Sequence, residues 1–239
     1  SYMSNDFTER AIVKESYQDD ILIRAIENIA MLLKEIYPSM HEGSLPNLND
    51  MLQVLVNFDL VEKMCEILSH DEKLKEKYAI QIDYFKKNFY KNGHHRQDTE
   101  KYVAPAVTQL DNLLRIPNVK SILCNRHNNL DFDNVLENAE VTFICTRRGD
   151  LGATSHKAFG LFFLLSMQNA ILRRKGNENN RVPHFLYIDE FPDFICKETE
   201  PIFTMYRKYR VGAMISIQNL SQLDPPNSKQ RFRKTILSN

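Results

Sequence analysis

The sequence predicts a chain with two parts: an all-α helical domain over residues 1–116, then part of an α/β domain with a mostly parallel sheet over residues 117–239. In the first part, apolar residues recur at the three- and four-residue spacing of helices with one buried face. In the second part, short apolar runs alternate with helical segments. Such runs are typical of strands covered on both faces, and their alternation with helices indicates an α/β sheet.

The helical part begins with a helix whose apolar residues share one face. They are Ile21, Ala25, Ile29, Leu32, Leu33 and Ile36. Pro38 is expected to end this helix, because proline lacks the amide proton that a helix interior needs. Asn47 or Asn49 is expected to cap the next helix, since an Asn side chain accepts hydrogen bonds from the first backbone amides. Ser69 and Glu72 have the spacing of a capping box before a later helix.

The predicted strands of the second part are the apolar runs at residues 119–124, 141–146, 185–188 and 213–217. The helices predicted between them span residues 131–137, 154–174 and 199–209. The longest apolar stretch, residues 158–172, is shorter than the roughly 20 residues that a membrane-spanning helix needs. It is therefore expected to be a helix among the most buried of the core, and any membrane anchor is expected outside these 239 residues.

Charge and cysteine content exclude several classes of protein. The 31 Lys and Arg balance the 31 Asp and Glu, which argues against a strongly basic nucleic-acid-binding domain but leaves room for local basic patches. The four cysteines are far apart, without a C-x-x-C pair. A zinc site and a disulfide framework are therefore not expected, and a reducing cytoplasmic setting fits.

The segment that carries chemistry is the run His184–Ile188, which ends in two adjacent carboxylates, Asp189 and Glu190. In P-loop ATPases this pattern is the Walker B strand, whose carboxyl end points into the crevice where ligands bind. Asp189 would hold the Mg²⁺ shell, and Glu190 would orient or polarise the attacking water. The alternative is a strand that merely ends in surface acids.

Residues downstream add to this pattern. The sequence RKYRVG, from Arg207, leads into the strand that ends at Gln218, so Arg207 and Gln218 are expected on the same side of the sheet. An amide at the tip of the strand beside Walker B can sense the γ-phosphate of ATP or position water. Alternatively, Gln218 is a helix or loop cap and the arginines are a solvated helix end.

The pieces DEF, RKYRVG and IQNLSQL between Phe185 and Leu223 resemble the coupling proteins of type IV secretion and conjugation, the TraG/TraD type. The resemblance includes the spacing of Arg207 and Gln218, and the loop from Thr146 to Gly152 resembles the segment before the family's long core helix. The version PHFLYIDEFPDF is similar to coupling proteins of Gram-positive conjugative elements.

The resemblance implies a partial RecA-like P-loop ATPase domain with an inserted all-α domain, in a membrane-anchored homo-hexamer at the cytoplasmic face of a bacterial membrane. ATP and Mg²⁺ are the implied cofactors, and Asp189, Glu190, Arg207 and Gln218 the implied catalytic residues, with Arg210 as an alternative arginine. The helical domain would recognise a relaxase–DNA complex or secreted effector proteins. DNA and the components of the secretion channel would be further partners.

The sequence departs from that family in one respect. A P-loop needs G-x-x-x-x-G-K-[ST], whose backbone amides and lysine bind phosphates, and none of the seven glycines opens such a motif. The sequence is therefore expected to begin after the helix that follows the Walker A loop, or to have lost that loop. Alone, it is not expected to hydrolyse ATP by the family mechanism.

Other candidate residues are weaker. His94, His95 and His127 lie in polar stretches without the spacing of metal ligands, and Cys145 has no evident base. The basic cluster predicted to contact DNA phosphates without reading sequence is Lys229, Arg231, Arg233 and Lys234. A solvated face is the alternative for it.

Three functions therefore stay open on the sequence. The first is an ATPase-domain fragment of a DNA-transfer motor. The second is a non-catalytic helical module that binds a relaxase or an effector, with the α/β part as its scaffold. The third is another P-loop family, such as a DNA-packaging or chromosome-partition motor.

Overall fold

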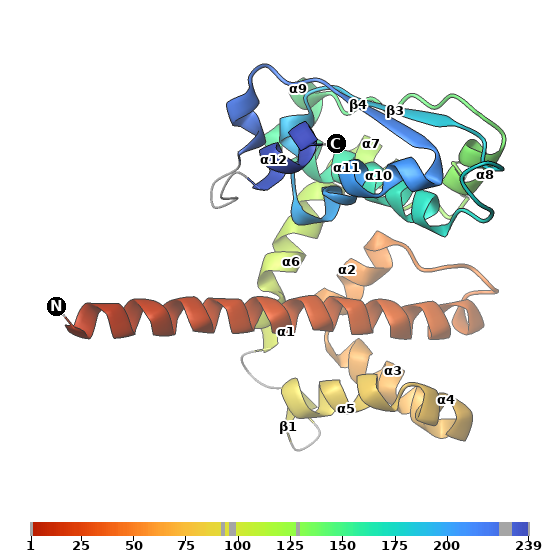
Figure 1. Cartoon of the computed structure of the whole chain (residues 1–239). Coiled ribbons are helices and arrows are strands. Elements are labelled where there is room, and N and C mark those ends of the chain that lie inside the picture. The colour runs from red at the N-terminus through yellow and green to blue at the C-terminus, as the bar shows by residue number, and fades with distance from the viewer. Residues whose placement is uncertain (1, 92–93, 96–98, 128–129, 225–230, 239) are drawn as a thin grey trace. The chain divides into compact units, whose positions relative to one another are not determined.

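The computed structural model describes residues 2–91, 94–95, 99–127, 130–224 and 231–238. The chain divides into two compact units, residues 1–127 and residues 128–239, and each is described by itself (Figure 1). The described residues are mostly helical, and the second unit adds a small parallel sheet of two strands.

The first unit is a set of helices with one short antiparallel hairpin. Its helices are α1 (Tyr2–Met40), α2 (Leu48–Val56), α3 (Asp59–His70), α4 (Glu72–Lys77), α5 (Ala79–Asn88), α6 (Thr99–Leu114) and α7 (Pro117–Leu123). Its hairpin pairs β1 (Tyr90–Lys91) with β2 (His94–His95).

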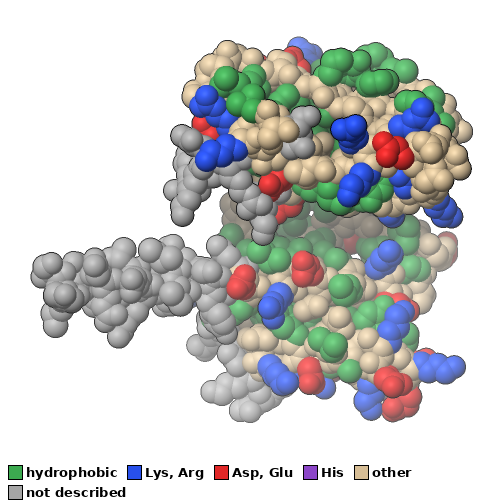
Figure 2. All heavy atoms as spheres, in the orientation of Figure 1, with side chains coloured by type: hydrophobic (Ala, Val, Ile, Leu, Met, Phe, Trp, Pro, Cys, Tyr) green, Lys and Arg blue, Asp and Glu red, His purple; other side chains and the backbone are tan. Residues whose placement is uncertain are grey.

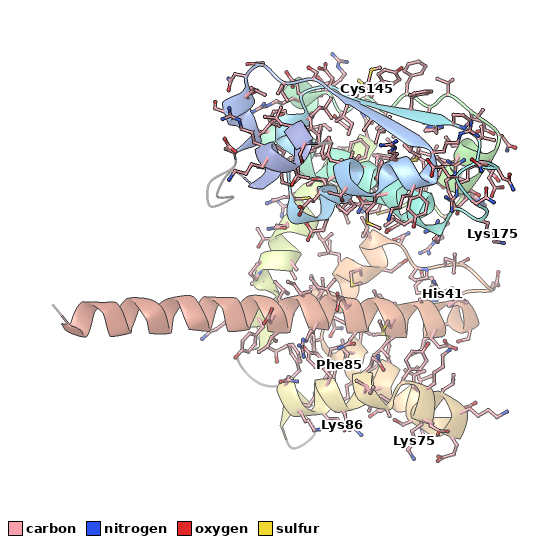
Figure 3. The ribbon with its side chains drawn as sticks, viewed as in Figure 1. His41, Lys75, Phe85, Lys86, Cys145 and Lys175 are labelled. Carbon is pink, nitrogen blue, oxygen red and sulfur yellow. The ribbon has the colours of Figure 1, made fainter. Side chains whose placement is uncertain are left out.

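The core of this unit lies between α1 and the helices that pack on it. Ala25, Ile29 and Leu32 are fully buried, which confirms the apolar face expected of the first helix. Aromatic rings complete the core: Phe58 stacks on Phe89 with ring centroids 4.9 Å apart. Phe85 belongs to the same core, whereas the labelled lysines of α4 and α5 are exposed (Figure 3).

Two of the expected helix boundaries differ from the structure. The prediction that Pro38 ends the first helix is wrong, because α1 continues to Met40. Proline in a last helical turn removes one hydrogen bond and does not prevent the residues after it from staying helical. The prediction of a Ser69 cap is also wrong: its hydroxyl donates to the Cys65 carbonyl within α3, and Asp71 caps α4.

The cap predicted for the second helix is confirmed at Asn47. Its side chain accepts hydrogen bonds from the amides of Asn49 and Asp50, and the Asp50 carboxylate accepts from the Asn47 amide. The Asn47 side-chain amide also donates to the Cys124 carbonyl. The cap therefore ties the start of α2 to the end of α7.

The prediction of a strand at residues 119–124 is wrong, since these residues belong to α7 and to its C-terminal cap. Pro117 stands at the first turn of α7, where proline is favoured because its missing amide proton has no helical partner. Arg126 then binds Asp50 and the Leu45 carbonyl. These contacts hold the segment after α7 in the helical unit.

The second unit contains the parallel sheet, helices and short 3-10 turns. Its α-helices are α8 (Phe132–Glu137), α9 (Arg148–Leu151), α10 (Ala153–Arg173), α11 (Pro201–Thr204) and α12 (Arg231–Ser238). Its strands are β3 (His184–Ile188) and β4 (Val211–Ile215), and its 3-10 turns are η1 (Phe191–Phe194), η2 (Lys197–Thr199), η3 (Tyr206–Tyr209) and η4 (Leu220–Leu223). The strands run parallel, with His184 opposite Val211 and Ile188 opposite Ile215.

The helix α10 packs on one face of this sheet (Figure 1). Ala170 and Ile171 are fully buried in a core that includes Leu186 and Ile188 of β3. The expectation that this helix is among the most buried holds for its C-terminal half. Farther towards its N-terminus, Phe162 is 41% exposed.

The prediction of a strand at residues 141–146 is wrong, because these residues form neither strand nor helix and are largely exposed. Phe143 is 93% exposed and Val141 80%. Phe185 and Tyr187 of β3 are exposed as well, and Figure 2 shows apolar side chains on the surface of this unit. An apolar run becomes a strand only where a neighbouring strand pairs with its backbone, and its hydrophobicity alone does not supply that partner.

A close helix contact makes Gly160 sensitive to substitution. A Cβ at Gly160 would lie 2.3 Å from Cε1 of Phe194, whose ring is buried against His156 and has little room to move. We expect Gly160→Ala to lower the free energy of unfolding by about 1–3 kcal/mol, which exceeds the roughly 1 kcal/mol that Ala gains over Gly in a helix. Urea unfolding followed by far-UV circular dichroism measures this change.

The matched control is Gly149→Ala in α9, where no atom lies within 4 Å of the added Cβ. We expect this control to be neutral or slightly stabilising. Equal stability of the two variants would contradict the tight contact between α10 and η1.

Candidate functional site

The candidate site lies at the carboxyl ends of the two parallel strands. Asp189 and Glu190 follow β3, and Ser216 to Gln218 follow β4. Hydrogen bonds join the two ends: Ser216 N donates to the Ile188 carbonyl (2.9 Å), and Phe191 N donates to the Ser216 carbonyl (3.1 Å). The parallel pairing therefore brings together groups that are about 30 residues apart in sequence.

A pocket of about 270 Å³ opens at these strand ends. Its lining residues are Arg148, Asp189, Glu190, Pro192, Asp193, Ser216, Ile217, Gln218 and Gln222. Three of the predicted site residues, Asp189, Glu190 and Gln218, thus line one pocket, and all three are exposed. The structure does not bring Arg207 into it.

The backbone turns sharply at Glu190. This residue has φ 49° and ψ 43°, a left-handed conformation that is uncommon for a residue with a side chain. The Glu190 amide donates to a carboxylate oxygen of Asp189 (3.0 Å), and the Asp193 amide donates to the Glu190 carbonyl (3.0 Å). Strained conformations of this kind concentrate at functional sites. Here the turn places the carboxylates of Asp189, Glu190 and Asp193 around one pocket.

The loop after β4 is held by its own side chains. The Gln222 side-chain oxygen accepts from the amides of Gln218 (2.9 Å) and Asn219 (3.3 Å). Asn219, not Gln218, is the N-cap of η4, and Leu223 buries the end of this turn in the core. The alternative of a capping role for Gln218 is therefore not supported, and its exposed side chain lies beside the acidic turn.

The two predicted arginines lie at the other end of β4. Arg207 is in η3 and Arg210 follows it, both before Val211, whereas Gln218 follows the strand. The expectation that Arg207 and Gln218 share one side of the sheet is wrong. One residue precedes β4 and the other follows it, so they lie near opposite ends of that strand. The single helix expected over residues 199–209 is divided between η2, α11 and η3.

Arginines hold the loops together at this amino-terminal end of the sheet. The Arg174 guanidinium donates to the carbonyls of Tyr209, Leu136 and Val182, and burial lowers its pKa. The guanidinium of Arg210 donates to the carbonyls of Asn179 (3.1 Å) and Arg181 (2.9 Å). These contacts give Arg210 a local structural role, whereas the Arg207 side chain is exposed.

A group of polar side chains missed by the sequence analysis joins the pocket to the start of α10. Nη1 of Arg148 lies 3.2 Å from Oδ2 of Asp193, and Nε2 of the buried His156 lies 3.5 Å from the same oxygen. The Nδ1 of His156 is hydrogen-bonded to the Thr146 carbonyl. The sequence offered one hint, the acidic residue three positions after Glu190, but no periodicity pairs it with Arg148.

A family model for type IV secretory system conjugative DNA transfer proteins matches residues 36–239 of the chain. The chain belongs to this family. The match spans both structural units and includes every residue of the pocket. It supports conjugative DNA transfer through type IV secretion as the process in which the chain takes part. The searches matched no curated protein and no solved structure.

Members of this family are expected to contact DNA, and the cluster predicted for that contact is only partly described. Lys229 and the side chain of Arg231 lie outside the described residues. Arg233 in α12 pairs with Asp224 (3.6 Å), which offsets part of its charge, and Lys234 is exposed. The prediction that this cluster binds DNA stays a prediction.

The donor set at the pocket suits a metal ion that arrives with a nucleotide. Within the described ranges, no three His, Cys, Asp or Glu side chains are grouped so that they could hold a metal ion. Asp189 and Glu190 nevertheless offer the exposed carboxylate oxygens that Mg²⁺ prefers. Mg²⁺ usually keeps several waters and binds one or two carboxylates together with substrate phosphates. The residues present therefore fit Mg²⁺ bound mainly through phosphate.

None of the helices in the described part of the chain combines the length and the apolar character that a membrane crossing requires.

Proposed function

We propose that this chain carries the Walker B and phosphate-sensing strands of an ATPase that couples ATP hydrolysis to conjugative DNA transfer, as a type IV coupling protein. One observation carries the proposal: parallel pairing of β3 with β4 places Asp189, Glu190 and Gln218 around one pocket. In open parallel sheets, ligands bind at the carboxyl ends of the strands. Membership of the conjugative DNA transfer family supports the biological process.

The residues take distinct roles in this proposal. Asp189 accepts hydrogen bonds from the water shell of the magnesium ion, and Glu190 accepts a proton from, or orients, the attacking water. Gln218 offers an amide that senses the terminal phosphate. Mg-ATP, when bound, supplies the transferable phosphoryl group and the metal charge that stabilises it. The left-handed turn at Glu190 fixes the direction in which its carboxylate leaves the strand.

The proposal requires a phosphate-binding loop that these 239 residues do not contain, since no G-x-x-x-x-G-K-[ST] occurs in them. We therefore propose that polypeptide outside this sequence supplies the loop and completes a RecA-like domain. In the same proposal, the helical unit is an inserted domain that recognises a relaxase–DNA complex or an effector. The whole protein is a homo-hexamer anchored at the cytoplasmic face of the membrane and in contact with the secretion channel.

The helical unit could instead be the functional part by itself, as a substrate-binding module. Its separate core favours this alternative, and so do exposed apolar side chains such as Ile80 of α5. Capture of a relaxase by the 239-residue chain, unaffected by Asp189→Ala, would support it.

The isolated 239-residue chain is expected to show no ATPase activity and at best weak affinity for Mg-ATP. Most of the binding energy comes from backbone amides and a lysine of the phosphate-binding loop, and Asp189 meets the metal mainly through the nucleotide. Phosphate release by the purified chain, with Asp189→Ala as its control, measures this. Turnover that Asp189→Ala abolishes would contradict the proposed division of the site.

A further inference from the structure

The pocket at the strand ends is lined by a basic side chain that is not among the proposed catalytic residues. Among its described lining residues, three are acidic, Asp189, Glu190 and Asp193, and Arg148 is the basic one. A nucleotide adds negative phosphate charge to this acidic surrounding, and the repulsion between phosphate and carboxylates is unfavourable without cations. A guanidinium in the same pocket therefore has a chemical partner when the nucleotide binds.

Local structure aims Arg148 at the pocket. It is the first residue of α9, directly after the irregular segment 141–147. The hydrogen bond between the Thr146 carbonyl and His156 fixes the end of that segment to the first turn of α10. The buried His156 ring also packs against Phe194, with centroids 5.3 Å apart. The backbone just before Arg148 is thus tied to α10 through His156, whose ring packs on Phe194.

The contact between Arg148 and Asp193 holds the guanidinium without removing it from water. Their atoms are 3.2 Å apart, and the Arg148 side chain keeps 57% of its surface exposed. An exposed ion pair of this kind is worth little by itself, so it can be exchanged for a stronger partner. A phosphate group accepts two parallel hydrogen bonds from a guanidinium and carries more charge than Asp193.

The neighbouring Arg147 is a natural comparison because it has the same chemistry and a different environment. Its Nε lies 3.2 Å from Asp150, and its side chain is also exposed. It borders the larger, mostly apolar cavity beside residues 141–146, which Arg148 and Asp189 also border, but it does not line the smaller pocket that contains Gln218.

We propose that Arg148 is a phosphate-binding residue of this site, held ready by Asp193 and His156, and that it contacts the terminal phosphate of the nucleotide. The inference rests on the proposed function, since it assigns a further residue to the same ATP site. Asp193 and His156 are positioning residues in this scheme, which act through Arg148. Gln218 and Arg148 line one pocket, so the terminal phosphate would meet both an amide and a guanidinium of the same chain.

The test compares nucleotide affinities of the full-length protein by fluorescence titration, with Mg²⁺ and either ATPγS or ADP as the probe. Arg148→Ala is expected to weaken ATPγS binding about tenfold, as expected for loss of one charge-assisted hydrogen bond, and to change ADP binding by less than about twofold. Arg148→Lys should recover part of the loss, because it keeps the charge. Arg147→Ala should bind both nucleotides like the parent protein.

The outcomes separate this inference from the proposed function. If Arg148→Ala keeps the parent ratio of ATPγS to ADP affinity while Asp189→Asn weakens Mg²⁺-dependent binding, Arg148 has no phosphate role and the ATP site stands. Equal losses for both nucleotides, without rescue by Lys, would make Arg148 merely structural and overturn the inference. Absence of nucleotide binding in the parent protein would overturn both.

Discussion

Glu190→Gln in the full-length protein is expected to leave Mg-ATP binding nearly intact and to slow hydrolysis by about 10²- to 10⁴-fold, the usual contribution of a general base. Glutamine keeps the size of the side chain but carries no carboxylate to accept the proton of the attacking water. Glu190 is suited to this role because it is exposed in the pocket beside Asp189 and is turned there by its left-handed backbone.

Equilibrium nucleotide binding and steady-state phosphate release, measured on the same preparation, test this expectation. The matched control is Glu178→Gln, an exposed glutamate in the loop before β3 that does not line the pocket. Gln218→Ala is expected to resemble Glu190→Gln, within its own subunit. Hydrolysis by Glu190→Gln at more than half the parent rate would show that Glu190 is only the acid at the end of a surface strand.

The sequence predicted best the elements whose periodicity and surroundings agree. The runs at 185–188 and 213–217 correspond to β3 and β4, shifted by at most two residues, and the apolar face of α1 is buried as expected. The helix at 154–174 also matches α10 closely. In these cases each segment finds within the chain the partner that its apolar residues require.

Two apolar runs show that hydrophobic pattern alone does not decide whether a segment forms a strand. Residues 119–124 and 141–146 have the composition of buried strands, but the first is helical and the second is irregular. A short apolar run fits a helix or a strand equally well, and long-range contacts decide between them. For α7 the deciding features are Pro117 at its first turn and the hydrogen bond from Asn47 to Cys124, a residue 77 positions away.

The candidate site was predictable where it follows from strand order and not where it depends on side-chain contacts. Asp189 and Gln218 each end a recognisable strand, so their shared pocket follows from parallel pairing. Arg148 reaches Asp193 across 45 residues through an irregular segment, which no local pattern encodes. The prediction for Arg207 is wrong because the residues before and after a short strand are close in sequence but lie near opposite ends of the strand.

Arg207→Ala in the full-length protein is expected to leave nucleotide binding nearly intact and to lower DNA-stimulated hydrolysis by about 10³- to 10⁵-fold, the effect of losing an arginine finger supplied in trans. The structure favours action in trans because η3 precedes β4, whereas the pocket lies beyond the carboxyl end of that strand. A strand of five residues extends about 13 Å between its first and last Cα at 3.3 Å per residue.

Arg207 is a better candidate than Arg210 for this role. The Arg210 guanidinium is engaged by the carbonyls of Asn179 and Arg181, and freeing it would break both hydrogen bonds. The exposed Arg207 side chain can be presented to a neighbouring subunit without such a loss. Lys208→Ala is the matched control, since Lys208 is an exposed cation of the same 3-10 turn.

Mixing of inactive variants decides whether Arg207 acts between subunits. In a closed ring, each head-to-tail interface would join the pocket of one subunit to the η3 turn of the next. Subunits with Arg207→Ala have an intact pocket, and subunits with Glu190→Gln have an intact arginine. Rings assembled from both therefore contain some interfaces in which both groups are intact, and hydrolysis should partly recover in proportion to their number. If normal hexamers form without any recovery, Arg207 acts within its own subunit or is a surface charge without a catalytic part.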